Sequence, residues 1–139
     1  MEKTVKRFGE FDIICSIHVI NYTGNPKKAI RVMSKALRTG GLLIIADIGR
    51  VLSVRRHGIE IFQALRKKHG LFGSLWRIKD FKEVIRQNRR FRTDQLRGVY
   101  PLHNLKEVEN WVESTGLKVI KAHSRLYLGD DDYVVAVKH

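Results

Sequence analysis

Two short apolar segments on either side of one amphipathic segment constrain the fold of this chain more than any other feature. Phe11–Ser16 (FDIICS) is a short apolar run rich in β-branched residues, which predicts a strand buried on both faces. Leu42–Asp47 (LLIIAD) is a second continuous apolar run that is too short for a helix. Between them, Asn25 is a favourable helix N-cap and Pro26 suits the first helical position. A strand, a helix and a second strand joined by few residues predict a right-handed parallel β-α-β unit.

The helix between these strands has one apolar face and a stop signal. Gly40 and Gly41 predict its C-terminal end, just before the second strand. The apolar residues that recur at helical spacing are Ala29, Ile30, Met33, Ala36 and Leu37.

The end of the chain predicts another helix and two strands. Asn104 begins a pattern like a capping box, and Gly116 ends the helix. The strands are Leu117–Tyr127 and Tyr133–Lys138, and the small and polar residues 129–132 between them predict a hairpin connection.

The middle of the chain is strongly basic. The whole sequence has 27 Lys and Arg against 14 Asp and Glu, a formal net charge of +13, and residues 50–97 account for +10 of it. Apolar residues at helical spacing predict two amphipathic helices separated by Gly70 and Gly73. We expect residues 1–139 to form a single domain in which residues 50–101 are a basic helical insert. The apolar positions are Ile59, Phe62 and Leu65 in the first helix, and Ile78, Phe81 and Ile85 in the second.

This charge favours an anionic partner, either nucleic acid or an anionic lipid surface. Phe72, Trp76 and Phe91 are interleaved with the basic residues, which suits base stacking, interfacial insertion or plain core packing. A solvated basic face is the alternative that stays open. The candidate anion-binding residues are Arg86, Arg89, Arg90 and Arg92.

Composition excludes several classes of protein. With 43% hydrophobic residues, 29% charged residues and two prolines, the chain is globular rather than disordered. Cys15 has no second cysteine to pair with, and inside an apolar strand we expect it to be a small buried hydrophobe. The six histidines lack metal-ligand spacing, so no metal site is predicted. Without an apolar N-terminal region or a run near the roughly 18 residues of a membrane span, we expect a cytoplasmic protein.

The order of elements and several motifs resemble the C-terminal half of a class I S-adenosylmethionine-dependent methyltransferase. Residues 11–47 carry an FD opening, a loop with a small polar residue, an L-R-x-G-G turn and an apolar strand that ends in an acid. Residues 103–123 resemble the later helix that feeds the family's sixth strand. The resemblance implies an α/β fold, a partial Rossmann-like sheet of strands four to seven with a terminal antiparallel hairpin and a helical insert.

The resemblance also implies methyl transfer from S-adenosylmethionine to an unidentified acceptor. In this family the cofactor lies against a glycine-rich turn after the first strand and an acid after the second. Only ten residues precede Phe11, so we expect the cofactor-binding N-terminal half to be absent, and S-adenosylmethionine to bind this chain alone weakly or not at all.

Candidate site residues follow from the same resemblance. Ser16, Ile17 and His18 correspond to the family's contact with the methionine end of the cofactor, or are core and turn residues. No catalytic residue is assigned. The candidates for substrate binding are Asn21, Tyr22, Asp47, Tyr100 and His103, and for Asn21, Tyr22 and Asp47 an ordinary loop or capping role stays open.

Assembly is a further expectation. Phe11–Ser16 would lie beside the missing first strand, and it has neither Pro nor Lys to protect an unpaired edge. We therefore expect a homo-oligomer or a complementing chain at this edge. The rival hypothesis is a non-catalytic module that binds nucleic acid or a partner through the basic insert.

Overall fold

The computed structural model describes residues 10–139, apart from the side chains at positions 78, 127 and 128. The chain divides into two compact units, which we call the sheet unit (Met1–Arg50 and Pro101–His139) and the helical unit (Val51–Tyr100). The helical unit nearly coincides with the basic segment of the sequence. Each unit is described by itself below.

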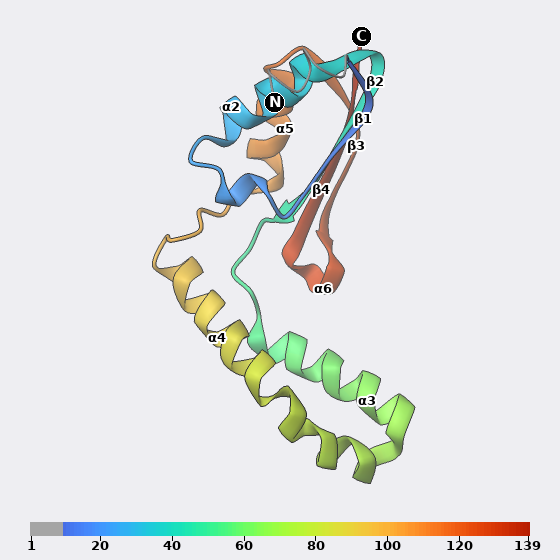
Figure 1. Ribbon diagram of the computed structural model, residues 1–139, viewed down its shortest axis with the longest axis vertical. Helices are drawn as coiled ribbons and strands as arrows, with labels where there is room; N and C mark the ends of the chain where they lie inside the picture. Colours follow the sequence, from blue (N-terminus) through green and yellow to red (C-terminus); the bar gives the residue numbers. More distant parts are fainter. Residues whose placement is uncertain (1–9) are drawn as a thin grey trace. The chain divides into compact units, whose positions relative to one another are not determined.

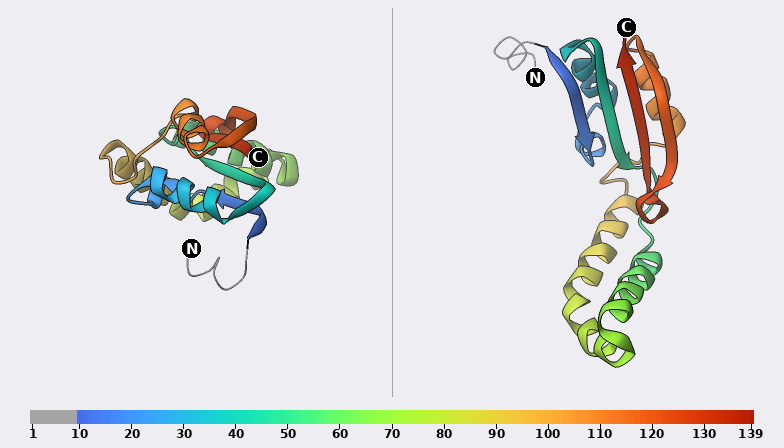
Figure 2. Two further views of the ribbon diagram at one scale, coloured as in Figure 1. Left: turned by 90° about the horizontal axis from the view of Figure 1, so that it is seen from above. Right: turned by 90° about the vertical axis from the view of Figure 1, so that its right-hand side faces the viewer.

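The sheet unit is a four-stranded mixed sheet with the order β1-β2-β4-β3 (Figures 1 and 2). β1 and β2 are parallel, and β4 is antiparallel to both of its neighbours, β2 and β3. This is the α/β fold with a terminal antiparallel pair that the sequence predicts. The elements are β1 (Phe11–Ile17), η1 (Ile20–Tyr22), α2 (Pro26–Ala36), β2 (Leu37–Ile48), α5 (Leu105–Glu113), β3 (Leu117–Leu126), α6 (Tyr127–Asp130) and β4 (Asp131–Lys138).

Both long helices of this unit begin where their caps predict. The Asn25 side chain accepts a hydrogen bond from the Lys28 amide at the start of α2. Asn104 and Glu107 form the reciprocal bonds of a capping box at the start of α5. Both helix starts depend on hydrogen bonds between residues three positions apart, so they can be predicted from the sequence.

Helices α2 and α5 lie on the same face of the sheet (Figures 1 and 2), and the core fills the space beneath them. On the opposite face of β1, Ile13 and Ile17 are exposed, and so is Cys15. The predictions of a strand buried on both faces and of a buried Cys15 are therefore wrong. β1 is an edge strand, and no described element of this unit packs over its second face. The buried core residues are Ile20, Ile30, Met33, Leu37, Leu43, Ile45, Val108, Val112, Leu117, Val134 and Ala136.

β2 begins earlier than the sequence predicts. α2 ends at Ala36, and Leu37 is the first residue of β2, not the last of the helix. Gly40 lies inside β2 with a φ of 77°, where the pairing with β1 shifts register. The glycines thus form an irregularity within a strand, whereas the sequence suggested a helix stop.

The predicted antiparallel hairpin is present, but its connection lies two residues earlier than residues 129–132. β4 begins at Asp131, and the chain turns through α6 before it. Asp131 pairs with Ile48 and Asp132 with Asp47 of β2, so both aspartates are residues of the sheet and not of the turn.

The helical unit contains α3 (Val54–Arg77), η2 (Ile78–Phe81) and α4 (Lys82–Leu96). Gly70, with φ 71° and ψ −179°, breaks the helical path inside α3. Gly73 stays helical, so only the first of the two glycines separates helices as predicted. Over the described residues, no helix combines the length and the apolar character that crossing a bilayer requires.

Candidate functional site

Three strands of the sheet unit bring polar residues to one edge. β1 and β2 are parallel, so their carboxyl ends meet at the same edge, and antiparallel β4 begins there. In the register of β2 and β4, Asp47 lies opposite Asp132 and Ile48 opposite Asp131. Open α/β sheets bind ligands at this edge.

His18 follows β1 directly and is held at this edge by two contacts. Its backbone adopts a left-handed conformation with a φ of 52°, and its amide donates to the Ala46 carbonyl at 2.8 Å. Its ring nitrogen Nε2 lies 2.9 Å from Asp131 Oδ2. The His18 side chain is 43% exposed and that of Asp131 13%. The arrangement presents an oriented imidazole to solvent, and such a group can accept or donate a proton.

Asn21 and Asp47 are both buried, and hydrogen bonds connect Asn21 with Asp47 and with the next residue of β2, Ile48. The Asn21 amide donates to Asp47 Oδ2 at 3.2 Å, and Asn21 Nδ2 donates to the Ile48 carbonyl at 2.8 Å. Asp47 Oδ1 also accepts from the Ile48 amide at 2.9 Å. These contacts fix the η1 loop, on which Tyr22 is exposed.

Asp132 lies behind this edge, and only one of its two carboxylate oxygens accepts hydrogen bonds from described residues. Its Oδ1 accepts from Arg50 Nη1 at 2.7 Å and from the Arg125 amide at 3.2 Å. Asp132 Oδ2 and His103 Nε2 are buried, and neither has a hydrogen-bond partner among the described residues. Together with Asn21 and Asp47 they line an enclosed cavity of about 10 Å³, which is room for about one water molecule and not for a substrate.

The structure therefore gathers four of the sequence-predicted site residues at one edge, namely His18, Asn21, Asp47 and His103. Ser16 is buried next to them along β1, and Ile17 is exposed. Tyr100 belongs to the helical unit, where its ring centroid is 5.3 Å from that of Phe91.

Sequence reasoning missed Asp131, Asp132 and Arg50. The three consecutive acids at 130–132 resemble a turn because they follow a glycine. A signal was present, since the continuous apolar run Tyr133–Val137 starts directly after these acids and is typical of a strand.

A match to a family model over most of the chain decides its family. The family model described as methyltransferase domain matches residues 2–122. The chain belongs to this methyltransferase family. The family and the α/β fold class predicted from the sequence are confirmed.

Two similar proteins place this methyltransferase chain among longer ones. Over 56 residues it is 34% identical to the mitochondrial ubiquinone biosynthesis O-methyltransferase of Dictyostelium discoideum, covering 36% of this chain and 17% of that protein. It shares its fold with an S-adenosylmethionine-dependent methyltransferase of Thermotoga maritima, described as a possible histamine N-methyltransferase, at a TM-score of 0.50 and 14% identity. That alignment covers 93% of this chain and 56% of the other. The chain thus spans about half of one relative and less of the other.

Two of the three residues that the family resemblance assigns to the cofactor are accessible at the edge of the sheet. Ile17 and His18 are exposed at the carboxyl end of β1. No glycine-rich turn follows a described strand. Gly40 and Gly41 lie inside β2, Gly70 and Gly73 lie inside α3, and Gly49 after β2 and Gly129 after β3 are single glycines. The described residues therefore hold no adenosine-binding turn. No group of His, Cys, Asp and Glu side chains suited to a metal ion is found among residues 10–139.

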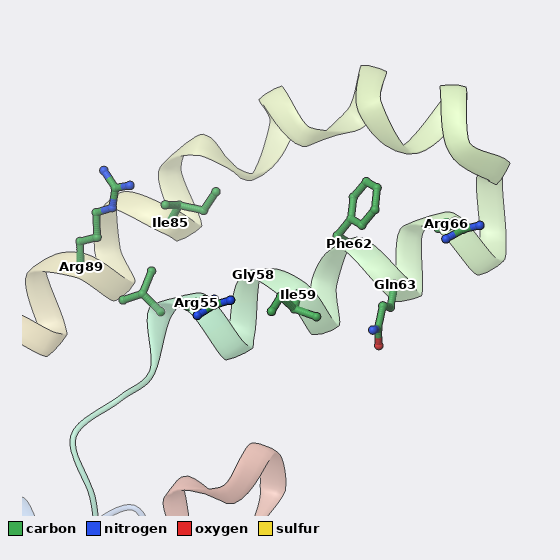
Figure 3. Close-up of a pocket in the computed structure, with 9 residues that line it drawn as sticks. Arg55, Gly58, Ile59, Phe62, Gln63, Arg66, Ile85 and Arg89 are labelled. Carbon is green, nitrogen blue, oxygen red and sulfur yellow. The ribbon is translucent and has the colours of Figure 1, made fainter.

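The helical unit has a groove between α3 and α4 of about 560 Å³ (Figure 3). Apolar Ile59, Phe62 and Ile85 line it together with Arg66 and Arg89. A second hollow of about 430 Å³ is lined by Lys79, Lys82, Ile85, Arg86 and Arg89.

The four candidate anion-binding arginines differ in their surroundings. Arg89 lines both hollows, and Arg90 is exposed. Arg92 Nη1 donates to the Leu52 carbonyl at 3.0 Å. Arg86 Nη2 pairs with Glu83 Oε1 at 2.8 Å, and this hydrogen bond raises the pKa of Arg86 and lowers that of Glu83.

Proposed function

We propose that this chain forms the acceptor-side part of an S-adenosylmethionine-dependent methyltransferase. The observation that carries the proposal is His18, partly exposed at the carboxyl end of β1 and oriented by Asp131. Membership of the family implies S-adenosylmethionine as the methyl donor, and His18 is a group able to take the proton of the methyl acceptor.

S-adenosylmethionine supplies an electrophilic methyl group when it is bound. Because the Asp131 carboxylate only accepts hydrogen bonds, His18 Nε2 carries its hydrogen towards Asp131, and Nδ1 is left as the basic nitrogen. Nδ1 takes the proton of an acceptor hydroxyl or amine, and the Asp131 carboxylate stabilises the imidazolium that results. The remaining contribution is orientation, because the bonds from Asn21 to Asp47 and Ile48 hold the η1 loop rigid beside His18.

The rest of the cofactor site comes from strands outside the described residues, either joined to this chain or in a complementing chain. Edge strand β1 and its exposed side chains Ile13 and Ile17 suit such an addition, because they offer unpaired backbone and apolar surface together.

Methyl transfer in an extract of the source cells tests the proposal. Depleting the protein that contains this chain should remove a methyl-transfer activity with labelled S-adenosylmethionine, and adding that purified protein should restore it. The His18→Asn variant should restore a methyl-transfer rate at least about a hundredfold lower than the wild type restores, since loss of a general base typically lowers the rate by 10²–10⁴. The matched control is His123→Asn, an exposed histidine on β3, which should restore full activity.

Two outcomes would contradict the proposal. Tight binding of S-adenosylmethionine by the chain alone in a calorimetric titration would show that no further strands are needed. If add-back restores no methyl transfer while the chain binds nucleic acid, the non-catalytic module is the better description.

A further inference from the structure

Four large apolar side chains are exposed together in the second part of α3. Leu71 is 49% exposed, Phe72 85%, Leu75 54% and Trp76 73%. Their spacing of one and four residues places them on one face of a helix. A soluble surface seldom gathers large apolar side chains in this way without a partner.

The backbone fixes the direction in which this face points. Gly70 breaks the helical path, so that residues 71–77 form a separate short helix. Ser74, on the other face, is fully buried and donates through Oγ to the Gly70 carbonyl. A buried serine and exposed aromatic side chains reverse the usual distribution of a water-facing helix.

Cations flank the apolar face on both sides. Residues 66–82 contain six Lys and Arg and one acid, Asp80. Lys67, Lys68 and Lys79 are exposed, and Lys79 Nζ lies 4.1 Å from the centre of the Trp76 ring. Lys79 also lines the 430 Å³ hollow with Lys82 and Arg86, so the basic surface continues onto α4.

We propose that residues 66–82, which we call the tip, dock into the surface of an anionic phospholipid bilayer. The Leu, Phe and Trp side chains enter the boundary between headgroups and acyl chains, and the flanking cations contact lipid phosphates. This interaction surface is independent of the methyl-transfer proposal, because it uses no residue of the sheet unit.

The apolar residues favour lipid over nucleic acid. Single-stranded RNA is bound by cations that follow its backbone and by aromatic rings that stack on bases. Leu71 and Leu75 have no π face to stack, and they lie exposed beside Phe72 and Trp76. An apolar face rimmed by cations complements a lipid headgroup layer, which has anionic phosphates above hydrocarbon.

Co-sedimentation with vesicles tests the docking. The full chain should bind vesicles of equal parts phosphatidylcholine and phosphatidylglycerol, release them at high salt, and bind phosphatidylcholine alone at least about tenfold more weakly. Bound protein should show a blue-shifted tryptophan emission, and Trp76→Phe should remove the shift while the signal of Trp111 persists.

Two variant sets separate the contributions of the tip. Phe72→Ser with Trp76→Ser should weaken vesicle binding about tenfold or more, and so should Lys67→Gln with Lys68→Gln. All four side chains are exposed, and circular dichroism checks that the helices stay folded. The control is Ile120→Ser, which removes an exposed apolar side chain from β3 and should leave binding unchanged.

The proposal is overturned if the chain does not bind phosphatidylglycerol vesicles at low salt. It is also overturned if the Phe72 and Trp76 changes have no effect. Tighter binding to poly(U) RNA that depends on Arg89 and Arg90, and not on Phe72 and Trp76, would assign the basic surface to nucleic acid instead.

Discussion

Gly49 follows β2 at a position where the structure leaves no room for a side chain. A Cβ there would lie 2.3 Å from Asp132 Oδ2 and 2.8 Å from Asp132 Cγ. Asp132 cannot move away cheaply, because it is buried and held by Arg50 and by the Arg125 amide. Gly49→Ala should therefore lower the free energy of unfolding by about 1–3 kcal/mol, measured by denaturant titration.

The control for this change is Gly24→Ala. A Cβ at Gly24 would meet none of the described residues within 4 Å, and the backbone there is not left-handed. Its replacement should therefore cost less than about 0.5 kcal/mol. Equal effects of the two changes would mean that the Asp132 carboxylate is not where the structure places it.

His69 allows a test of the electrostatics in the helical unit. Partial desolvation, together with the positive charges of Arg77 and Lys68, lowers the pKa of His69 below its ordinary 6.5. An NMR titration should show the lowered pKa, and Arg77→Gln should raise it, whereas Arg55→Gln should not.

The sign of the linked stability change follows. With the folded pKa below the unfolded one, the unfolded chain binds more protons between the two values. The contribution of His69 to stability is therefore present above about pH 6.5 and is lost as the pH falls through the folded pKa. A His69→Gln variant should lose this part of the pH dependence.

At the scale of elements, two glycines of α3 should respond to alanine in opposite directions. Gly70 has φ 71° and ψ −179°, a conformation that side chains strongly disfavour, so Gly70→Ala should destabilise the helical unit by about 1–3 kcal/mol. Gly58 is helical with open space around it, so Gly58→Ala should stabilise the same unit by about 0.5–1 kcal/mol. Thermal unfolding followed by circular dichroism measures both, and a stabilising Gly70→Ala would show that α3 continues unbroken through position 70.

Element starts were predictable where local chemistry decides them. Asn25 and Asn104 cap their helices through bonds to residues three positions away, and such patterns are visible in a sequence. Leu37 was not predictable, because a buried apolar residue satisfies a helix and a strand equally, and only its pairing with Phe11 places it in β2. The entry of Asp131 and Asp132 into the sheet likewise depends on distant partners in β2.

The residues of the candidate site also fall into those that the sequence could predict and those that it could not. His18 and Asp47 were predictable because they end apolar segments, and the carboxyl ends of strands are where α/β sheets bind ligands. The role of Asp131 was not predictable from the sequence, since Asp131 and its partner His18 are 113 positions apart in the chain. Exposure of Cys15 and of the tip also depends on which faces remain uncovered, and composition does not contain that information.

At the scale of the whole molecule, β1 determines how the chain should assemble. It is an edge strand that exposes Ile13 at 55% and Ile17 at 61%, and among the described strands it pairs on one side alone, with β2. An edge of this kind, without Pro or Lys, is a template for another strand. We therefore expect the purified chain to be other than a monomer, paired either with a second copy or with a chain that carries further strands of the sheet.

Sedimentation velocity at micromolar concentration tests this last prediction. The chain should sediment as a dimer or larger species, and Ile13→Lys should shift it towards the monomer, because a lysine on the edge opposes strand pairing without touching the core. Ile14→Lys is the less informative change, since Ile14 packs against the core and the change would also destabilise the sheet unit. Ile120→Lys places the same charge on β3 at the other end of the sheet and should leave the assembly intact. If only Ile120→Lys dissociates the assembly, the contact runs through β3. A wild-type monomer whose β1 amides resist hydrogen exchange would mean that another part of this chain covers the edge.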